Sequence, residues 1–226
     1  MARTAVIGRG WGSRVQSPLL KEAGHDVSIH PVPNEVEPAI PFAKDNQPRA
    51  YDPDSARRLL EALINADRIF RLFRSGFLGK ASPVHFFWGS FDLAVTRFSG
   101  RPAPLHPGGI PHLPDAVTRE AYSHEVSSAG FWPGGAGAGG EPFFYSYAYP
   151  SPQGFARARV EPEAAGFDEG LGEFVLPYDA VRTARDPDSA LLDFVETTYG
   201  AAADLGGWDR PALDCGRGVP GMPRPV

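Results

Sequence analysis

Two histidines and an aspartate in the middle of the chain have the side chains that acid–base and metal chemistry need. SPVHFFWGSFDLAVTRFSG, residues 82–100, carries His85 and Asp92 among clustered aromatic residues, and AYSHEVSSAGFW, residues 121–132, carries His124. A carboxylate that holds an imidazole fixes its tautomer, which catalytic and metal-ligating histidines require. Two histidines with one carboxylate are also a ligand set for transition metals. The chemistry therefore depends on whether the fold brings the three residues together.

Alternation along two predicted strands places His85 and Asp92 on the same side of a hairpin. In VHFFW, residues 84–88, and in FDLAVTRF, residues 91–98, successive side chains point to opposite faces, and a Gly-Ser turn joins the two strands. We expect a structural His–Asp pair, because half-buried polar groups need partners, with a catalytic or metal-binding pair as the alternative. His124 would complete a metal site only through a pairing that the sequence does not prove. No compact motif such as H-E-x-x-H occurs, so we expect no metal.

Aromatic side chains supply the walls of a candidate binding site beside these polar residues. Trp88 and Trp132 lie in predicted strands, and Tyr145, Tyr147 and Tyr149 alternate onto one strand face. Such a face with a few polar groups can bind a flat or sugar-like small molecule, and it can equally be sheet core or an interface. The candidate ligand-binding residues are His85, Trp88, Asp92, His124, Trp132 and Tyr147.

The motifs of nucleotide binding and covalent catalysis are incomplete or absent. Gly8, Gly10 and Gly12 are spaced G-x-G-x-G, one residue short of the dinucleotide fingerprint. Pro18 then interrupts the helix that should follow. No G-x-S-x-G serine motif occurs, and Cys215 stands in a Gly- and Pro-rich tail without catalytic partners. We therefore expect no cofactor and no covalent nucleophile.

Two amphipathic helices bracket the region that holds these residues. The first begins at DPDSARRLL, where Asp52 is a good N-cap and Pro53 fits the first helical position. The same DPDSA opening recurs at residues 186–190 and starts the second helix, which Gly206 and Gly207 end. Each helix carries one apolar stripe at helical spacing. The stripes are Leu59, Leu63, Ala66, Phe70, Phe73 and Phe77 in the first helix, and Leu191, Phe194, Val195, Thr198, Ala202 and Leu205 in the second.

Between the helices the hydrophobic period is two, which predicts strands. The candidates are residues 84–88, 91–98, 119–132, 141–150 and 171–178. Since no helix is expected between them, they form an antiparallel sheet, and the helical stripes cover one of its faces. The predicted fold class is α+β, with an antiparallel β-sheet of about five strands flanked by two amphipathic helices. The predicted domains are an N-terminal segment and linker over residues 1–50, the α+β domain over 51–208 and a disordered tail over 209–226.

Composition narrows the class of protein. The 26 glycines and 24 prolines indicate many loops, and His106, His112 and Asp115 in one of them are expected to be solvated. A net charge of −5 gives no support for nucleic-acid binding or a polybasic membrane contact, and no apolar run approaches the ~20 residues that span a bilayer. The single cysteine excludes an intrachain disulfide and fits a reducing compartment, so we predict a cytoplasmic protein. The oligomeric state is not specified by the sequence.

Three strings resemble a bacterial domain-of-unknown-function family, the one numbered five-nine-nine-six: SPVHFFWGSFDLAVTRFSGRPAP, TREAYSHEVSSAGFWPGG and FFYSYAYP. The resemblance runs from about Leu20 to about Trp208, and residues 1–18 do not share it. It implies no established activity, cofactor or catalytic residue. Because relatives look longer at the N-terminus, it implies that residues 1–50 are the remnant of a missing upstream half. The sheet would then have an exposed edge or apolar patch.

These observations lead to three hypotheses about function. The first is a non-catalytic ligand-binding or structural domain with a polar–aromatic cleft, in which His85 and Asp92 orient each other and a small molecule is the partner. The alternative is a metal-dependent or acid–base enzyme that uses His85, Asp92 and His124. The third is that this short form has no function of its own.

Overall fold

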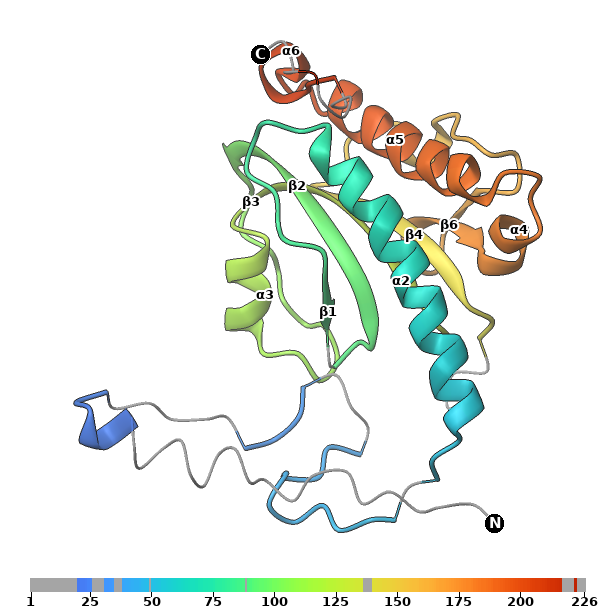
Figure 1. Cartoon of the computed structure of the whole chain (residues 1–226). Helices are drawn as coiled ribbons and strands as arrows, with labels where there is room; N and C mark the ends of the chain where they lie inside the picture. Colours follow the sequence, from blue (N-terminus) through green and yellow to red (C-terminus); the bar gives the residue numbers. More distant parts are fainter. Residues whose placement is uncertain are drawn as a thin grey trace.

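The computed structural model describes residues 20–25, 31–34, 38–48, 50–87, 89–135, 140–216 and 222. Trp88, a candidate site residue, lies outside the described residues, as do residues 1–19 of the predicted N-terminal segment. Figure 1 shows one sheet with two long helices across one of its faces.

A six-stranded sheet forms the centre of the molecule, in the order β1-β2-β3-β4-β6-β5. All neighbouring strands pair antiparallel. The strands lie in the order in which they occur in the sequence, except that β5 is the edge strand and pairs with the outer side of β6. The strands are β1 (His85–Phe87), β2 (Asp92–Pro102), β3 (His124–Trp132), β4 (Phe143–Tyr149), β5 (Gly166–Asp168) and β6 (Glu173–Pro177). The predicted α+β class is confirmed.

Two long helices, α2 (Pro53–Ser75) and α5 (Pro187–Leu205), form the layer that covers the sheet (Figure 1). Asp52 and Asp186 cap them as predicted, since each side chain accepts a backbone N–H of the first turn. The short helices are α3 (Asp115–Ala121), α4 (Tyr178–Arg182), α6 (Arg210–Leu213) and the 3-10 helix η1 (Phe155–Arg157). Among the helices of the described residues, none is long and apolar enough to cross a membrane.

The core lies between this helical layer and the inner face of the sheet. Phe70 of α2 meets the edge of Phe144 of β4 at a ring distance of 6.3 Å, and Phe194 and Val195 of α5 are fully buried. Each such side chain stabilises the fold by roughly 1.5–3 kcal/mol through the apolar surface that it removes from water. The predicted stripe of α5 ends early, because Leu205 is 48% exposed.

Three elements differ from the sequence prediction. β5 was not predicted, because three residues are too few to show a period of two. Residues 119–121 belong to α3, so β3 begins only at His124, and a helix does stand between two strands. The predicted disordered tail begins as folded chain: α6 is followed by Asp214, which pairs with Phe77, and by Cys215, whose N–H donates to the carbonyl of Gly76 at the end of α2 at 3.0 Å.

Candidate functional site

Polar and aromatic side chains gather on the sheet face opposite α2 and α5. Residues that lie directly across from one another on neighbouring strands share a face. The register places Thr96 opposite Ser128 and Ser128 opposite Tyr147, and it places Gly130 opposite Tyr145. We call the side of the sheet that carries these five residues the tyrosine face.

A glycine at position 130 lets Tyr145 lie across the sheet. A Cβ added at Gly130 would come within 2.3 Å of the Tyr145 hydroxyl oxygen, so the phenol occupies the space that another side chain would fill. From there the Tyr145 hydroxyl donates a hydrogen bond to Asp92, and Ser90 donates a second one at 2.7 Å. Burial, followed by the charge of Asp92, raises the pKa of Tyr145 well above its ordinary value. The phenol therefore stays protonated and remains a donor at neutral pH.

A second chain of hydroxyl groups lies beside this pair. Thr96 Oγ1 and Ser128 Oγ share a hydrogen bond of 2.9 Å, and Ser128 also bonds the hydroxyl of Tyr147. Tyr122, at the end of α3, donates to the same Tyr147 oxygen at 2.9 Å. Burial, followed by the neighbouring Tyr122, raises the pKa of Tyr147 well above its ordinary value. The tyrosine face is thus a fixed, hydrogen-bonded surface.

Glu173, on β6, is a half-buried carboxyl group to which no residue in the described part of the chain donates a hydrogen bond. It stands directly opposite Asp168 in the β5–β6 pair. Burial, followed by the charges of Asp168 and Asp92, raises the pKa of Glu173 to about 7. The residue is only half-buried, so its carboxyl group can meet a ligand. We call Asp92, Tyr145, Asp168 and Glu173 the acid–tyrosine cluster.

This cluster can accept and donate hydrogen bonds at neutral pH. Asp92, 6% exposed, is already occupied by Tyr145 and Ser90. Asp168 accepts two backbone N–H groups of the turn that follows it, at 2.8 and 2.9 Å. Glu173 is the member left to exchange a proton or to contact another molecule.

His85 lies on the predicted face but does not bond Asp92. The hairpin register places His85 opposite Ala94 and Phe87 opposite Asp92. The His85 imidazole contacts the Pro83 carbonyl at 3.1 Å and packs against the Phe87 ring at 4.2 Å. The predicted His–Asp pair is therefore not formed, because a phenylalanine stands in the position that faces the carboxylate.

His124 lies at the opposite end of the sheet from His85. It pairs with Pro102, whereas His85 pairs with Ala94 of the same strand, β2. On β3 the two positions correspond to Gly130 and His124, and these six residues of strand separate them by roughly 20 Å at ~3.3 Å per residue. The set of His85, Asp92 and His124 is thus not assembled, and in the described ranges no group of three His, Cys, Asp or Glu residues could hold a metal ion.

The remaining candidate residues occupy the tyrosine face or its end. Tyr147 lies at its centre, and Trp132 packs its ring on Phe143 at 5.3 Å at the end of β3. His106, predicted to be solvated, is instead half-buried, with its ring 4.8 Å from Tyr122 and 4.9 Å from Tyr149. The proline-rich loop thus lies against the tyrosine face.

Sequence reasoning missed Tyr145 and Glu173 as site residues. A signal for Glu173 existed: in the predicted strand LGEFVLPY, Glu173 and Val175 alternate onto one face while Phe174 and Leu176 take the core face. An acidic residue at that position is unusual for a half-buried strand. No local signal indicated that β6 would lie beside β4 and place Glu173 near Asp92.

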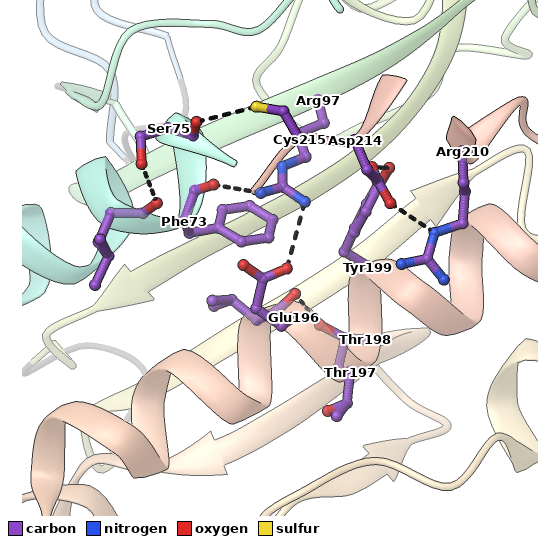
Figure 2. A network of polar contacts seen from close by, with 12 residues as sticks. Phe73, Ser75, Arg97, Glu196, Thr197, Thr198, Tyr199, Arg210, Asp214 and Cys215 are labelled. Atoms are coloured by element: carbon purple, nitrogen blue, oxygen red, sulfur yellow. Dashed lines mark hydrogen bonds and ion pairs between the residues drawn. The ribbon is translucent and has the colours of Figure 1, made fainter. Parts of the chain in front are cut away.

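A second polar network lies on the helix-covered face (Figure 2). Arg97 of β2 is 1% exposed, and its guanidinium lies over the rings of Phe73 and Tyr199 at 3.5 and 4.2 Å. It donates to the Phe73 carbonyl and faces Glu196 at 3.5 Å. Burial lowers the pKa of Arg97, against the opposing effect of Glu196. Because the group is closed off from solvent, this network is structural.

The network continues into residues 209–216, which we call the C-terminal clasp. Tyr199 donates to Asp214, and Arg210 donates to the same carboxylate at 2.8 Å (Figure 2). Cys215 N donates to Gly76 O at 3.0 Å, at the end of α2. The clasp therefore joins α5 to α2 directly beside Arg97.

Two pockets of the described chain lie away from the acid–tyrosine cluster. One lies between β3, β4 and the end of α5, and the other between residues 32–39 and 112–114. The predicted cleft beside His85 and Asp92 stays a prediction.

One family model matches the chain, over residues 14–215, and its description is a family of unknown function, DUF5996. The predicted family is thereby confirmed, while the bacterial origin and the missing upstream half stay predictions. The match begins within residues 1–18, for which no resemblance was expected, and its last residue, Cys215, lies in the C-terminal clasp. No curated protein and no solved structure matches the chain.

Proposed function

Since this chain belongs to DUF5996, a family whose description names no activity, we propose its function from the acid–tyrosine cluster: a non-catalytic domain that binds a small molecule on the tyrosine face. Glu173 is the polar contact for the ligand. Tyr145 and Asp92 form the fixed surface beneath it, and Tyr147 extends that surface toward α3. The ligand carries hydrogen-bond donors for the carboxyl group and an apolar body for the tyrosines.

The observation that supports this proposal is the unshared carboxyl group of Glu173. Half-buried acids in a purely structural role are normally paired, because burial without a partner penalises the charged form. Glu173 has two acidic neighbours, Asp168 and Asp92, instead of a basic one. A donor group of a ligand would relieve this electrostatic cost. The neighbouring tyrosines add apolar contact area at little loss of side-chain freedom.

A ligand screen with matched variants tests the proposal. Wild-type protein is screened against a small-molecule library by thermal shift, and each stabilising compound is retested on Glu173→Gln and Glu169→Gln. Glu169 is exposed on the turn next to the same strand, so it serves as the control. We expect affinity to fall about tenfold or more in Glu173→Gln only. If every stabilising compound binds both variants as tightly as wild type, the proposed site is contradicted.

A second candidate function is an acid–base enzyme that uses the same glutamate. The pKa of Glu173, about 7, is the value that suits a general acid or base at neutral pH. Any compound that the screen identifies is incubated with wild type and followed by NMR for conversion. A rate that changes near pH 7 in wild type and is lost in Glu173→Gln would favour the enzyme. Unchanged ligand after prolonged incubation would leave the binding domain as the function.

We further propose that the protein acts in the cytoplasm. Cys215 is the one cysteine of the sequence, and its thiol donates to the Ser75 carbonyl at 3.5 Å inside the folded domain. A chain with one cysteine cannot form the intrachain disulfide that stabilises many proteins of oxidising compartments. Fractionation of the native cells with an antibody against this chain checks the location, and recovery from a secreted or membrane fraction would contradict it.

A further inference from the structure

A separate pocket lies at the other end of the sheet from the acid–tyrosine cluster. Its walls come from the start of β3, the end of β4, the turn after it, and the last turn of α5. The lining residues that matter here are Glu125, Ala148, Tyr149, Ala202 and Trp208. Its volume of about 90 Å³ equals roughly three water molecules, which is less than the ~150 Å³ that hold a benzene ring.

Glu125 is the acidic residue of the pocket lining, and only one of its two carboxylate oxygens accepts hydrogen bonds from described residues. Ser99 donates to Glu125 Oε2 at 2.8 Å, and Arg101 donates to the same oxygen through Nε at 2.9 Å and through Nη2 at 2.6 Å. Oε1 accepts no hydrogen bond from any residue in the described ranges. Arg101 also donates to the carbonyls of Gly206 and Gly207, which fixes the carboxylate against the end of α5.

Arg101 forms an ion pair with Glu125 and neutralises its charge, so the pocket has no net negative charge that would favour a cation. The oxygen Oε1 of Glu125 can instead accept a hydrogen bond from a neutral donor. The other lining side chains are apolar or aromatic: Ala148 of β4, Ala202 of α5 and Trp208, which follows α5. Apolar walls favour a ligand that displaces water with hydrocarbon.

We propose that this pocket is a second binding site, which takes a neutral hydroxyl or primary amide group on a short aliphatic body of about four non-hydrogen atoms. The donor group bonds Glu125 Oε1, and the aliphatic part lies against Ala148, Ala202 and Trp208. Such a small group alone binds in the millimolar range, so it is the end of a larger ligand or a small alcohol or amide by itself. Nothing in this proposal depends on the acid–tyrosine cluster.

Two solvents of matched size test the site on the full chain. The protein is titrated with 2-propanol and, separately, with acetone, which has the same number of non-hydrogen atoms but no donor. The indole N–H signals of Trp208 and Trp132 are followed by NMR; Trp132 lies at the far end of β3 and is the control. We expect a saturable shift of Trp208 with 2-propanol, at least threefold weaker binding of acetone, and no saturable shift of Trp132.

A variant that fills the pocket gives the second arm of the test. Ala148→Val adds two methyl groups to the wall and should abolish the saturable Trp208 shift while the spectrum stays folded. If this variant does not fold, crystals of the wild type soaked in 2-propanol show directly whether the alcohol hydroxyl lies within hydrogen-bond distance of Glu125. Equal binding of acetone, a linear Trp208 response, or ordered water alone in the soaked pocket would each overturn the proposal.

Discussion

Glu173 makes the proposed site sensitive to pH. Its pKa is about 7 in the folded protein and about 4.5 in the unfolded chain, because burial and the charges of Asp168 and Asp92 disfavour ionisation. Folded protein therefore holds the proton over a pH range in which the unfolded chain has lost it. As pH rises from about 4.5 to about 7, the contribution of this group to stability falls, and above pH 7 the loss is complete.

We therefore expect Glu173→Gln to be more stable than wild type at pH 8, by about 1–2 kcal/mol after allowance for partial exposure, and equal to it near pH 4. Urea unfolding at the two pH values measures the difference. Glu169→Gln should match wild type at both. A Glu173 pKa at or below 4.5 in an NMR titration would rule out this explanation.

Gly130 is the residue on which the position of Tyr145 depends. Gly130→Ala would place a methyl group 2.3 Å from the Tyr145 hydroxyl oxygen, so the ring must move and release Asp92. We expect a loss of about 1–3 kcal/mol in the free energy of unfolding. Gly166→Ala on β5, where a Cβ meets nothing within 4 Å, is the matched control and should cost nothing. Equal effects of both changes on urea unfolding would show that Tyr145 is not held by this contact.

At the scale of elements, the C-terminal clasp acts as part of the helical layer. Its last residues pair with the end of α2, and Asp214 receives hydrogen bonds from Tyr199 of α5 and from Arg210. It covers Phe77 and Tyr199, which are 8% and 1% exposed. The family match also extends to Cys215.

Removal of the clasp should therefore damage the domain. A chain that ends at Trp208 should lose at least about 2 kcal/mol of stability, since it exposes aromatic surface and gives up several hydrogen bonds. A chain that ends at Gly216 keeps every contact named here and should unfold like the full chain. Thermal unfolding of the two truncated proteins compares them. Equal midpoints would mean that the domain ends at 208, as the sequence predicted.

At the scale of the whole molecule, Arg97 connects the sheet to both long helices. Its side chain touches Phe73 of α2 and Tyr199 and Glu196 of α5, and it lies beside the clasp (Figure 2). The charge itself adds little net stability, because desolvation of a buried ion offsets much of its attraction to a partner. The packing of the long side chain against the rings is the larger contribution.

We expect Arg97→Met to stay within about 1 kcal/mol of wild type and Arg97→Ala to lose about 3 kcal/mol or more. Methionine fills the space, Glu196 stays partly solvated, and the Phe73 carbonyl keeps its hydrogen bond from Gly76 N. Urea unfolding of the two variants separates packing from charge. A methionine variant as unstable as the alanine variant would show that the ion pair, rather than the packing, stabilises this core.

The sequence alone determined the features that depend on neighbouring residues. Two helix starts are predicted by an aspartate followed by a proline, at Asp52-Pro53 and at Asp186-Pro187. The aspartate caps the N-terminus of the helix and the proline has a fixed φ angle, and both effects depend only on neighbouring residues. A period of two predicted five of the strands, the α+β class followed from them, and the strings around His85 and His124 indicated the family. His85 and Asp92 do share a sheet face, as alternation required.

Only the tertiary structure decided which of these residues meet. Register places Phe87 rather than His85 opposite Asp92, and it leaves His124 at the far end of β2, although both segments looked equally suited to a site. The approach of β6 to β4 brings Glu173 toward Asp92, and a missing Cβ at Gly130 lets Tyr145 reach that carboxylate. Tyr145 and Glu173 are 53 and 81 positions from Asp92 in the sequence. Strand pairing and packing bring residues at such separations together, and the local periodicity of the sequence does not predict which of them meet.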